Sequence, residues 1–155
     1  MAVKTDYLQS NYLIERLHRQ FLEVVKNELD RHGMQDINNI QAVILYNIGE
    51  DELTVGELTN RGYYLGSNVS YNVKKMVENG YLIQQRSPHD GRAFYVRVSD
   101  DGKKIVEALA ALFERDAKEL AETKISGESL KDTSRVLGRM QLHWSGQSQL
   151  LGLAG

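Results

Sequence analysis

The sequence predicts a mainly α-helical protein that carries one small β-hairpin. Apolar residues recur at helical spacing over most of the 155 residues, and the chain holds a single proline, which favours long uninterrupted helices. The hairpin is predicted from two short strand-like segments, 81–86 and 93–98, on either side of a turn-forming stretch. With 41% hydrophobic and 26% charged residues, the chain is expected to fold as one domain with a buried core.

Four helices are expected before the hairpin. The first covers 5–32 and ends at Gly33, and the second covers 38–47 and ends at Gly49. A capping box, Thr54 with Glu57, begins a short third helix over 55–60. Ser67 is the expected cap of a fourth helix over 68–79.

Two further helices are expected after the hairpin. One begins at the segment 99–102 and reaches about residue 123, and the other follows Gly127 as far as Trp144. The Gly/Ser/Gln-rich stretch 146–155 is expected to be a flexible tail. Two short helices across a tight turn, followed at once by a hairpin, predict a winged helix-turn-helix. The outer helices carry more apolar surface than that module needs, which predicts a partner.

The composition excludes several classes of protein. The absence of cysteine removes disulfide scaffolds, cysteine zinc sites and thiol chemistry. No apolar stretch approaches the roughly 20 residues of a membrane span and no export signal opens the chain, so we expect a cytoplasmic protein without membrane contact. No metal-ligand spacing, nucleophile–base pattern or phosphate-binding glycine loop occurs, so we expect no enzyme, metal or cofactor. The histidines are scattered at His18, His32, His89 and His143.

Charge is divided unevenly along the chain. Residues 61–97 hold six basic and two acidic side chains, a local charge of +4, whereas the remaining residues together carry −6. A basic segment in an acidic protein indicates a local site for an anionic partner. A solvated charged face would give the same arithmetic, so the arrangement of the residues has to decide.

The fourth predicted helix has the pattern of a helix that reads DNA. Its face of Val69, Val73, Met76 and Val77 is expected to pack inward. Small polar groups near its start suit base edges, and cations further along suit phosphates. An ordinary amphipathic helix is the alternative, and the adjoining basic hairpin loop favours DNA. We expect base contacts from Ser67, Asn68, Ser70, Tyr71 and Asn72, phosphate contacts from Lys74, Lys75 and Arg86, and a wing formed by Arg92 with His89.

Residues 53–102 resemble the MarR family of bacterial transcription regulators. The similarity lies in Val55-Gly56-Glu57-Leu58, in the helix that ends Val77-Glu78-Asn79-Gly80-Tyr81-Leu82, in the wing 86–92 and in the exit 96–102. The family wing usually reads Asp-Pro-x-Asp-Arg-Arg and is followed by Thr-x-x-Gly. Pro88, Asp90, Arg92 and Gly102 fit, with Ser99 standing for the threonine, whereas Ser87 replaces the aspartate and Gly91 replaces the first arginine. The stretch 63–72 is similar to a variant found in alphaproteobacterial members.

The resemblance implies a homodimer that binds a pseudo-palindromic DNA site, with Arg92 inserted into the minor groove and Asp90 orienting it. It implies a single domain over 1–155, in which 38–100 form the DNA-binding lobe and 5–32 with 102–145 form a helical dimerisation lobe. It further implies a repressor that a small aromatic or anionic effector releases from double-stranded DNA. Aromatic and cationic groups for such an effector are available from Tyr12, Arg16, Arg19 and Tyr46, and ordinary core or surface placement is the alternative for each of them. The competing hypothesis is a winged-helix module that binds another protein without sequence-specific DNA binding.

Overall fold

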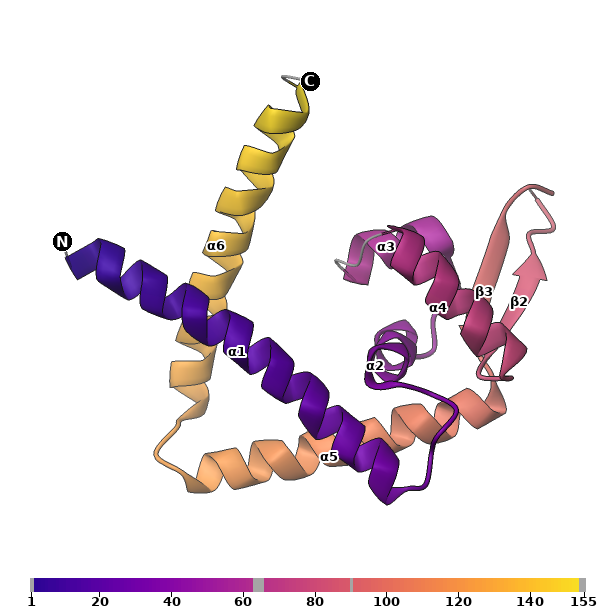
Figure 1. Cartoon of the computed structure of the whole chain (residues 1–155), viewed down its shortest axis with the longest axis horizontal. Coiled ribbons are helices and arrows are strands. Elements are labelled where there is room, and N and C mark those ends of the chain that lie inside the picture. Colours follow the sequence, from indigo (N-terminus) through magenta and orange to yellow (C-terminus); the bar gives the residue numbers. More distant parts are fainter. Residues whose placement is uncertain (1, 63–65, 90, 154–155) are drawn as a thin grey trace. The chain divides into compact units, whose positions relative to one another are not determined.

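The computed structural model describes residues 2–62, 66–89 and 91–153, and it confirms a mainly helical chain with a small sheet. Each predicted helix and strand is present, with most bounds shifted by one to three residues and the last helix extended beyond its predicted end. The elements along the chain are α1 (Ala2–Arg31), α2 (Asn39–Ile48), β1 (Leu53–Thr54), α3 (Val55–Gly62), α4 (Gly66–Glu78), β2 (Leu82–Arg86), β3 (Phe94–Val98), α5 (Asp100–Glu122) and α6 (Gly127–Leu153) (Figure 1).

The sheet has three antiparallel strands in the order β1-β3-β2. The hairpin register pairs Leu82 with Val98 and Arg86 with Phe94, and Figure 1 shows this hairpin beside α4. The strand β1 was not predicted, because two residues are too few to show an alternating pattern. It pairs Leu53 with Val96, and both side chains are buried, so it attaches the start of α3 to the hairpin.

The chain divides into two compact units, Met1–Leu112 and Phe113–Gly155. Every apolar side chain that is buried among the described residues belongs to the first unit. Burial of each such aliphatic side chain contributes about 1.5–3 kcal/mol, so this core supports the winged helix-turn-helix. Its largest fully buried members are Ile44, Leu45, Ile48, Leu58, Met76, Ile105, Leu109, Val25, Val69 and Val96.

The helix α1 contributes to that core only near its C-terminal end. Val25 and Leu29 are buried there, whereas Leu13 and Leu17, further toward the N-terminus, are 45% and 59% exposed within this single chain. Phe21 and Val24 are also exposed. Most of the apolar stripe of this amphipathic helix is therefore uncovered within the single chain.

The second unit consists of the end of α5, a short connection and α6. The last helix was predicted to end at Trp144, ahead of a tail from residue 146, and this bound was wrong because α6 continues to Leu153. A glycine or serine costs a helix about 1 kcal/mol or less, and the leucines among them are good helix formers. The described apolar side chains of α6 are exposed or half-buried, and the large exposed ones are Leu130, Val136, Leu137, Leu142 and Trp144.

No helix in the described ranges is long and apolar enough to cross a membrane.

Candidate nucleic-acid interface

The helix α4 presents a polar face opposite its packed face, as the sequence predicts. Val69, Val73 and Met76 are buried, with exposed fractions of 0–4%. On the other side Asn68 and Ser70 are exposed, and Tyr71 is 61% exposed. The Ser67 side chain lies outside the described residues. Two of the small polar groups expected to contact bases are therefore accessible to a partner.

Asn72 differs from the other expected base contacts, because both ends of its amide are engaged within the protein. Its Oδ1 accepts a hydrogen bond of 3.2 Å from Nε2 of Gln41, and its Nδ2 donates one of 2.8 Å to the carbonyl of Asn68. Gln41 is buried in α2. These two bonds fix the orientation of the amide, and one Nδ2 hydrogen remains for a further contact. The signal for this pairing, two polar residues 31 positions apart, is not local and sequence reasoning missed it.

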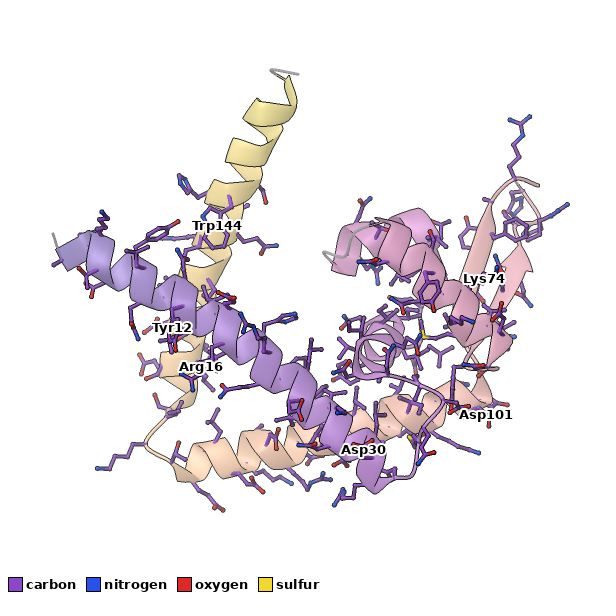
Figure 2. The ribbon with its side chains drawn as sticks, in the orientation of Figure 1. Tyr12, Arg16, Asp30, Lys74, Asp101 and Trp144 are labelled. Carbon is purple, nitrogen blue, oxygen red and sulfur yellow. The ribbon has the colours of Figure 1, made fainter. Side chains whose placement is uncertain are left out.

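The expected phosphate contacts Lys74 and Lys75 are exposed on α4. Nζ of Lys75 lies 3.5 Å from a carboxylate oxygen of Glu78. An exposed ion pair of this kind contributes about 0–1 kcal/mol to stability, so the Lys75 side chain can leave Glu78 to contact a phosphate. Lys74, labelled on α4 in Figure 2, is one of the residues that line a cavity of about 500 Å³ between α4, the start of α3 and β2. The residues that line this cavity are Val55, Ser70, Val73, Lys74, Val77, Glu78 and Gln84.

The wing is a short loop that its own backbone closes. The Ser87 amide donates to the carbonyl of Ala93 at 2.8 Å, and the Ser87 hydroxyl accepts from the amide of His89 at 3.3 Å. Ser87 thus organises the turn at the position where the family usually has aspartate. His89 and Arg92 are exposed at the tip, and Asp90 lies outside the described residues.

Arg86 is held at the base of the wing by an aromatic ring. Its guanidinium carbon lies 5.4 Å from the ring centroid of Phe94, the residue opposite it in the hairpin register. Such a cation–π contact at an exposed site is worth about 0.5–1 kcal/mol and limits the directions that the side chain samples. The Arg86 side chain remains exposed while the Phe94 ring restricts its position.

Loss of the Phe94 ring is expected to weaken DNA binding modestly. Phe94→Leu keeps an apolar side chain and removes the π-face, so we expect an affinity about two- to five-fold lower. Fluorescence anisotropy with a labelled duplex measures this change. Phe94→Tyr keeps the ring and serves as the control, and equal affinities for Phe94→Leu and the wild type would contradict the assignment.

Comparisons with known proteins agree with this geometry. The family model described as "MarR family" matches residues 32–93. The transcriptional activator ExpG of exopolysaccharide II synthesis from Rhizobium meliloti is 33% identical over 138 residues, which cover 89% of this chain and 71% of that protein. This chain belongs to the MarR family. It is therefore a transcriptional regulator of that family and not an enzyme.

Solved MarR-family structures share the fold at lower identity. The Staphylococcus aureus MepR–DNA complex matches with a TM-score of 0.72 at 20% identity, covering 86% of this chain and 96% of that one. The Staphylococcus aureus MarR structure with salicylate and kanamycin matches with a TM-score of 0.68 at 20% identity, covering 90% and 94%. These likenesses confirm the winged helix fold of this MarR-family chain.

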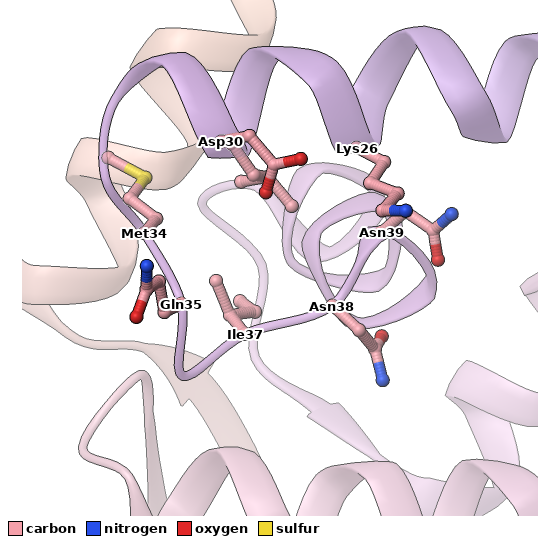
Figure 3. Close-up of a pocket in the computed structure, with 8 residues that line it drawn as sticks. Lys26, Asp30, Met34, Gln35, Ile37, Asn38 and Asn39 are labelled. Carbon is pink, nitrogen blue, oxygen red and sulfur yellow. The ribbon is translucent and has the colours of Figure 1, made fainter.

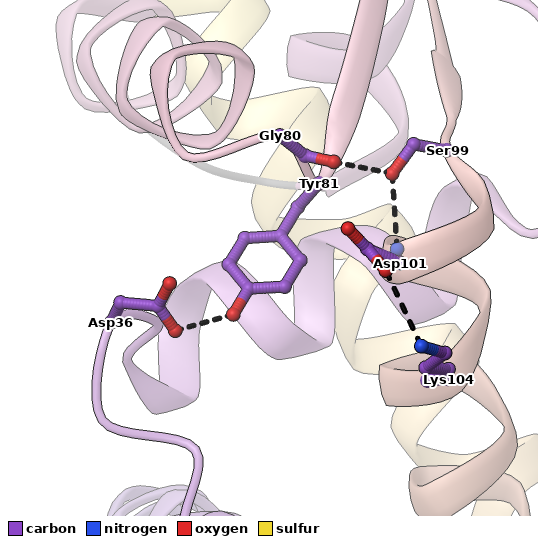
Figure 4. Close-up of polar contacts among 7 residues, drawn as sticks. Asp36, Gly80, Tyr81, Ser99, Asp101 and Lys104 are labelled. Carbon is purple, nitrogen blue, oxygen red and sulfur yellow. Dashed lines mark hydrogen bonds and ion pairs between the residues drawn. The ribbon is translucent and has the colours of Figure 1, made fainter.

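The joint between the wing and α5 is built around Ser99. In this MarR-family chain Ser99 takes the place of the usual threonine, and its hydroxyl donates to the carbonyl of Gly80 at 2.5 Å and accepts from the amide of Gly102 at 3.0 Å (Figure 4). The Ser99 amide donates to the carbonyl of Tyr81 at 3.0 Å. One residue therefore caps α5 and ties it to the turn that follows α4.

Tyr81 contributes a titratable hydroxyl at the same joint. Partial burial of the side chain, the hydrogen bond that its hydroxyl donates to Asp36, and the nearby charges of Asp36 and Asp101 together raise the pKa of Tyr81 to about 12. The neutral phenol is therefore favoured in the folded state. Figure 4 shows the Tyr81 ring reaching from the turn after α4 to the Asp36 carboxylate.

The raised pKa predicts an alkaline loss of stability. The contribution of Tyr81 is complete below the ordinary tyrosine pKa of about 10, and it is lost as the pH rises through the folded value of about 12. Urea unfolding between about pH 9 and pH 12 should therefore show a steeper decline for the wild type than for Tyr81→Phe. Parallel declines would contradict a stabilised neutral phenol.

The expected effector residues are only partly brought together. Nη1 of Arg16 donates to the hydroxyl of Tyr12 at 2.9 Å, one turn away on α1 (Figure 2), while Arg19 pairs with Glu15. A cavity of about 190 Å³ is lined by Tyr12, Glu15, Arg16 and Arg19. Tyr46, on α2, is not among the residues that line it.

A larger cavity that sequence reasoning missed lies between the end of α1 and the start of α2 (Figure 3). It has a volume of about 350 Å³, with Leu29, Met34 and Ile37 as apolar lining and polar side chains around them. The polar lining residues are Lys26, Asp30, Gln35, Asn38 and Asn39. Gly33 and the asparagines signal a turn in the sequence, but not a hollow.

Proposed function

We propose that this MarR-family regulator binds double-stranded DNA in a sequence-specific manner as a homodimer on a pseudo-palindromic site. The main observation in support of DNA binding is the polar face of α4, which is exposed beside a wing that presents Arg86 and Arg92. A helix of this kind enters a major groove, and a basic wing reaches the adjacent minor groove. The −2 net charge of the whole chain does not oppose this, because the cations are concentrated at the interface.

The roles of individual residues follow from their exposure and chemistry. Asn68, Ser70 and Tyr71, with Ser67 at the helix start, are proposed to contact base edges. Lys74, Lys75 and Arg86 are proposed to hold phosphates, and His89, Asp90 and Arg92 to form the wing contact. Asn72, whose amide oxygen is bonded to Gln41 of α2, is proposed to hold the helix in place and to offer its remaining Nδ2 hydrogen to a base edge.

The homodimer is proposed from the uncovered apolar helix faces, and it assigns 5–32 and 102–145 to a dimerisation lobe and 38–100 to a DNA-binding lobe. The described part of the second unit buries no apolar side chain. On α6, for example, the side chains of Leu137 and Trp144 are 41% and 39% exposed within the single chain. An amphipathic helix gains most of its stability from covering such a face.

Light scattering should therefore give a mass twice that of the 17.6 kDa chain. Leu17→Asp and Leu137→Asp should each shift the mass toward that of one chain, because a carboxylate would be buried without a partner. Arg135→Ala on the polar side of α6 is the matched control and should leave the mass unchanged. A wild type that stays monomeric at every concentration would overturn the dimer.

Selection of bound duplexes from a random library tests the DNA proposal. Enrichment of an inverted repeat by the wild type, lost in Arg92→Ala, is the expected result. The competing protein-binding module predicts no enriched sequence from protein that is folded and dimeric. That outcome would overturn sequence-specific binding.

For the direction of regulation we propose repression, from the family resemblance. Activation is the second candidate, because the 33% identical relative ExpG is a transcriptional activator. A reporter gene placed behind the selected site distinguishes them, because expression rises on deletion of a repressor and falls on deletion of an activator.

Release by a small aromatic or anionic effector is also proposed, with Tyr12, Arg16, Arg19 and Tyr46 as contacts. The structure of the Staphylococcus aureus MarR protein with salicylate supports this ligand class. Release requires that the ligand bind more tightly to a form that does not bind DNA. Salicylate added to the DNA complex tests this directly, and unchanged anisotropy at millimolar ligand would overturn release by that molecule.

A further inference from the structure

The connection between α1 and α2 is bonded to the far end of α4 through Asp36. The Asp36 carbonyl accepts a hydrogen bond of 3.1 Å from Nδ2 of Asn79, and its carboxylate accepts one from the Tyr81 hydroxyl. Asn79 and Tyr81 lie 43 and 45 positions away in the sequence, one and three residues beyond the last residue of α4. Figure 4 shows the Tyr81 contact.

A second contact from the same region reaches the middle of α4 through Gln41. Gln41 is buried, its Oε1 accepts from the amide of Asn38 at 3.2 Å, and its Nε2 donates to Asn72 at 3.2 Å. One side chain therefore both completes the cap of α2 and holds a side chain of α4.

The contacts of Asp36 and Gln41 fix the direction of the α4 axis as well as its position. Asn72 and Asn79 are seven residues apart, which corresponds to roughly 10 Å along a helix axis. The aliphatic packing of Val69, Val73 and Met76 is non-directional and tolerates small rotations of the helix. Hydrogen bonds at two separated points are directional, so together they define the direction of the axis.

The same connection is also bonded to α1, the helix with the uncovered apolar face. Nδ2 of Asn39 donates to the carbonyl of Leu22 at 3.0 Å, and the amide of Met34 donates to the carbonyl of Leu29 at 3.0 Å. Residues 34–41 are thus bonded to α1 on one side and to α4 on the other.

We propose that Asp36 and Gln41 are positioning residues, which set the direction of α4 relative to α1 and thereby the half-site spacing that the dimer accepts. This inference rests on the proposed function, since spacing has meaning only for two recognition helices on one DNA site. Neither residue touches DNA in this assignment. Their effect is on the discrimination between sites, because the spacing of half-sites mirrors the spacing of the recognition helices.

The experiment compares binding to the selected inverted repeat with binding to the same repeat after one base pair is inserted or removed between its halves. The wild type should prefer the native spacing by about ten-fold or more. Gln41→Leu combined with Tyr81→Phe should reduce the preference to about three-fold or less, while the slope of affinity against salt stays unchanged because no phosphate contact is lost.

Conservative variants separate positioning from a general loss of stability. Asp36→Asn retains an acceptor for the Tyr81 hydroxyl and should keep the spacing preference, whereas Asp36→Ala should lose part of it. If the double variant does not fold, Tyr81→Phe alone decides, because it removes one oxygen and keeps the ring.

The outcomes separate this proposal from the proposed function. Folded, dimeric variants that bind with the wild-type spacing preference would overturn the positioning role, even if their melting temperature falls. A wild type that prefers no sequence would overturn sequence-specific binding and the positioning role with it. A lost preference with an unchanged salt slope supports the proposal.

Discussion

Replacing Gly102 with alanine is expected to lower the free energy of unfolding by about 3 kcal/mol, the upper end of what overpacking of a tight site costs. A Cβ at this position would lie 2.3 Å from the carbonyl oxygen of Tyr81 and 2.7 Å from Cγ1 of Val98. The carbonyl cannot simply move aside, because it accepts the Ser99 amide and so joins α5 to the turn after α4. Gly102 is required for close approach, and not for an unusual backbone angle.

Urea denaturation measures this loss, and Gly138→Ala is the matched control. A Cβ on Gly138 would meet nothing within 4 Å, and the position lies inside α6. Alanine there should therefore leave stability unchanged or raise it by up to about 1 kcal/mol through helix propensity. A Gly102→Ala chain as stable as the wild type would show that the start of α5 can shift away from Tyr81.

The sequence predicts the elements well where their pattern is local. The apolar face of α4 follows from the spacing of Val69, Val73 and Met76, and the structure buries all three. The hairpin follows from its turn formers and alternating strands. The end of α6 was predicted too early, because glycine and serine between residues 145 and 149 suggest a frayed end. These residues only weaken a helix whose other residues favour it.

The contacts that organise the candidate site are harder to predict, because they join distant residues. The pairing of Gln41 with Asn72 and of Asp36 with Tyr81 depends on how the elements pack, and no periodic pattern in the sequence predicts it. The contact of Arg86 with Phe94 is an intermediate case. The predicted hairpin places these two residues opposite each other once its register is known, so a register argument could have found the pair.

Replacing Arg92 with alanine is expected to weaken binding to the selected site by about 1–3 kcal/mol, or roughly 5- to 150-fold, the range of a direct arginine contact. Arg92 is exposed at the wing, where the family resemblance places the inserted arginine. A narrow minor groove concentrates negative potential, so a guanidinium inserted there gains more than one that lies on the outer backbone. Fluorescence anisotropy at two salt concentrations measures both the affinity and its salt slope.

Two matched variants decide whether the position or only the charge of Arg92 matters. Arg135→Ala removes one exposed arginine from α6, where it pairs with Asp132 at 2.9 Å, and leaves the same net charge as Arg92→Ala. If only net charge mattered, the two variants would bind equally, whereas we expect Arg135→Ala to bind as the wild type. Arg92→Lys keeps the charge but not the planar fork, so it should recover the salt slope and only part of the affinity. Full recovery by lysine would show that the wing holds a phosphate and does not read the groove.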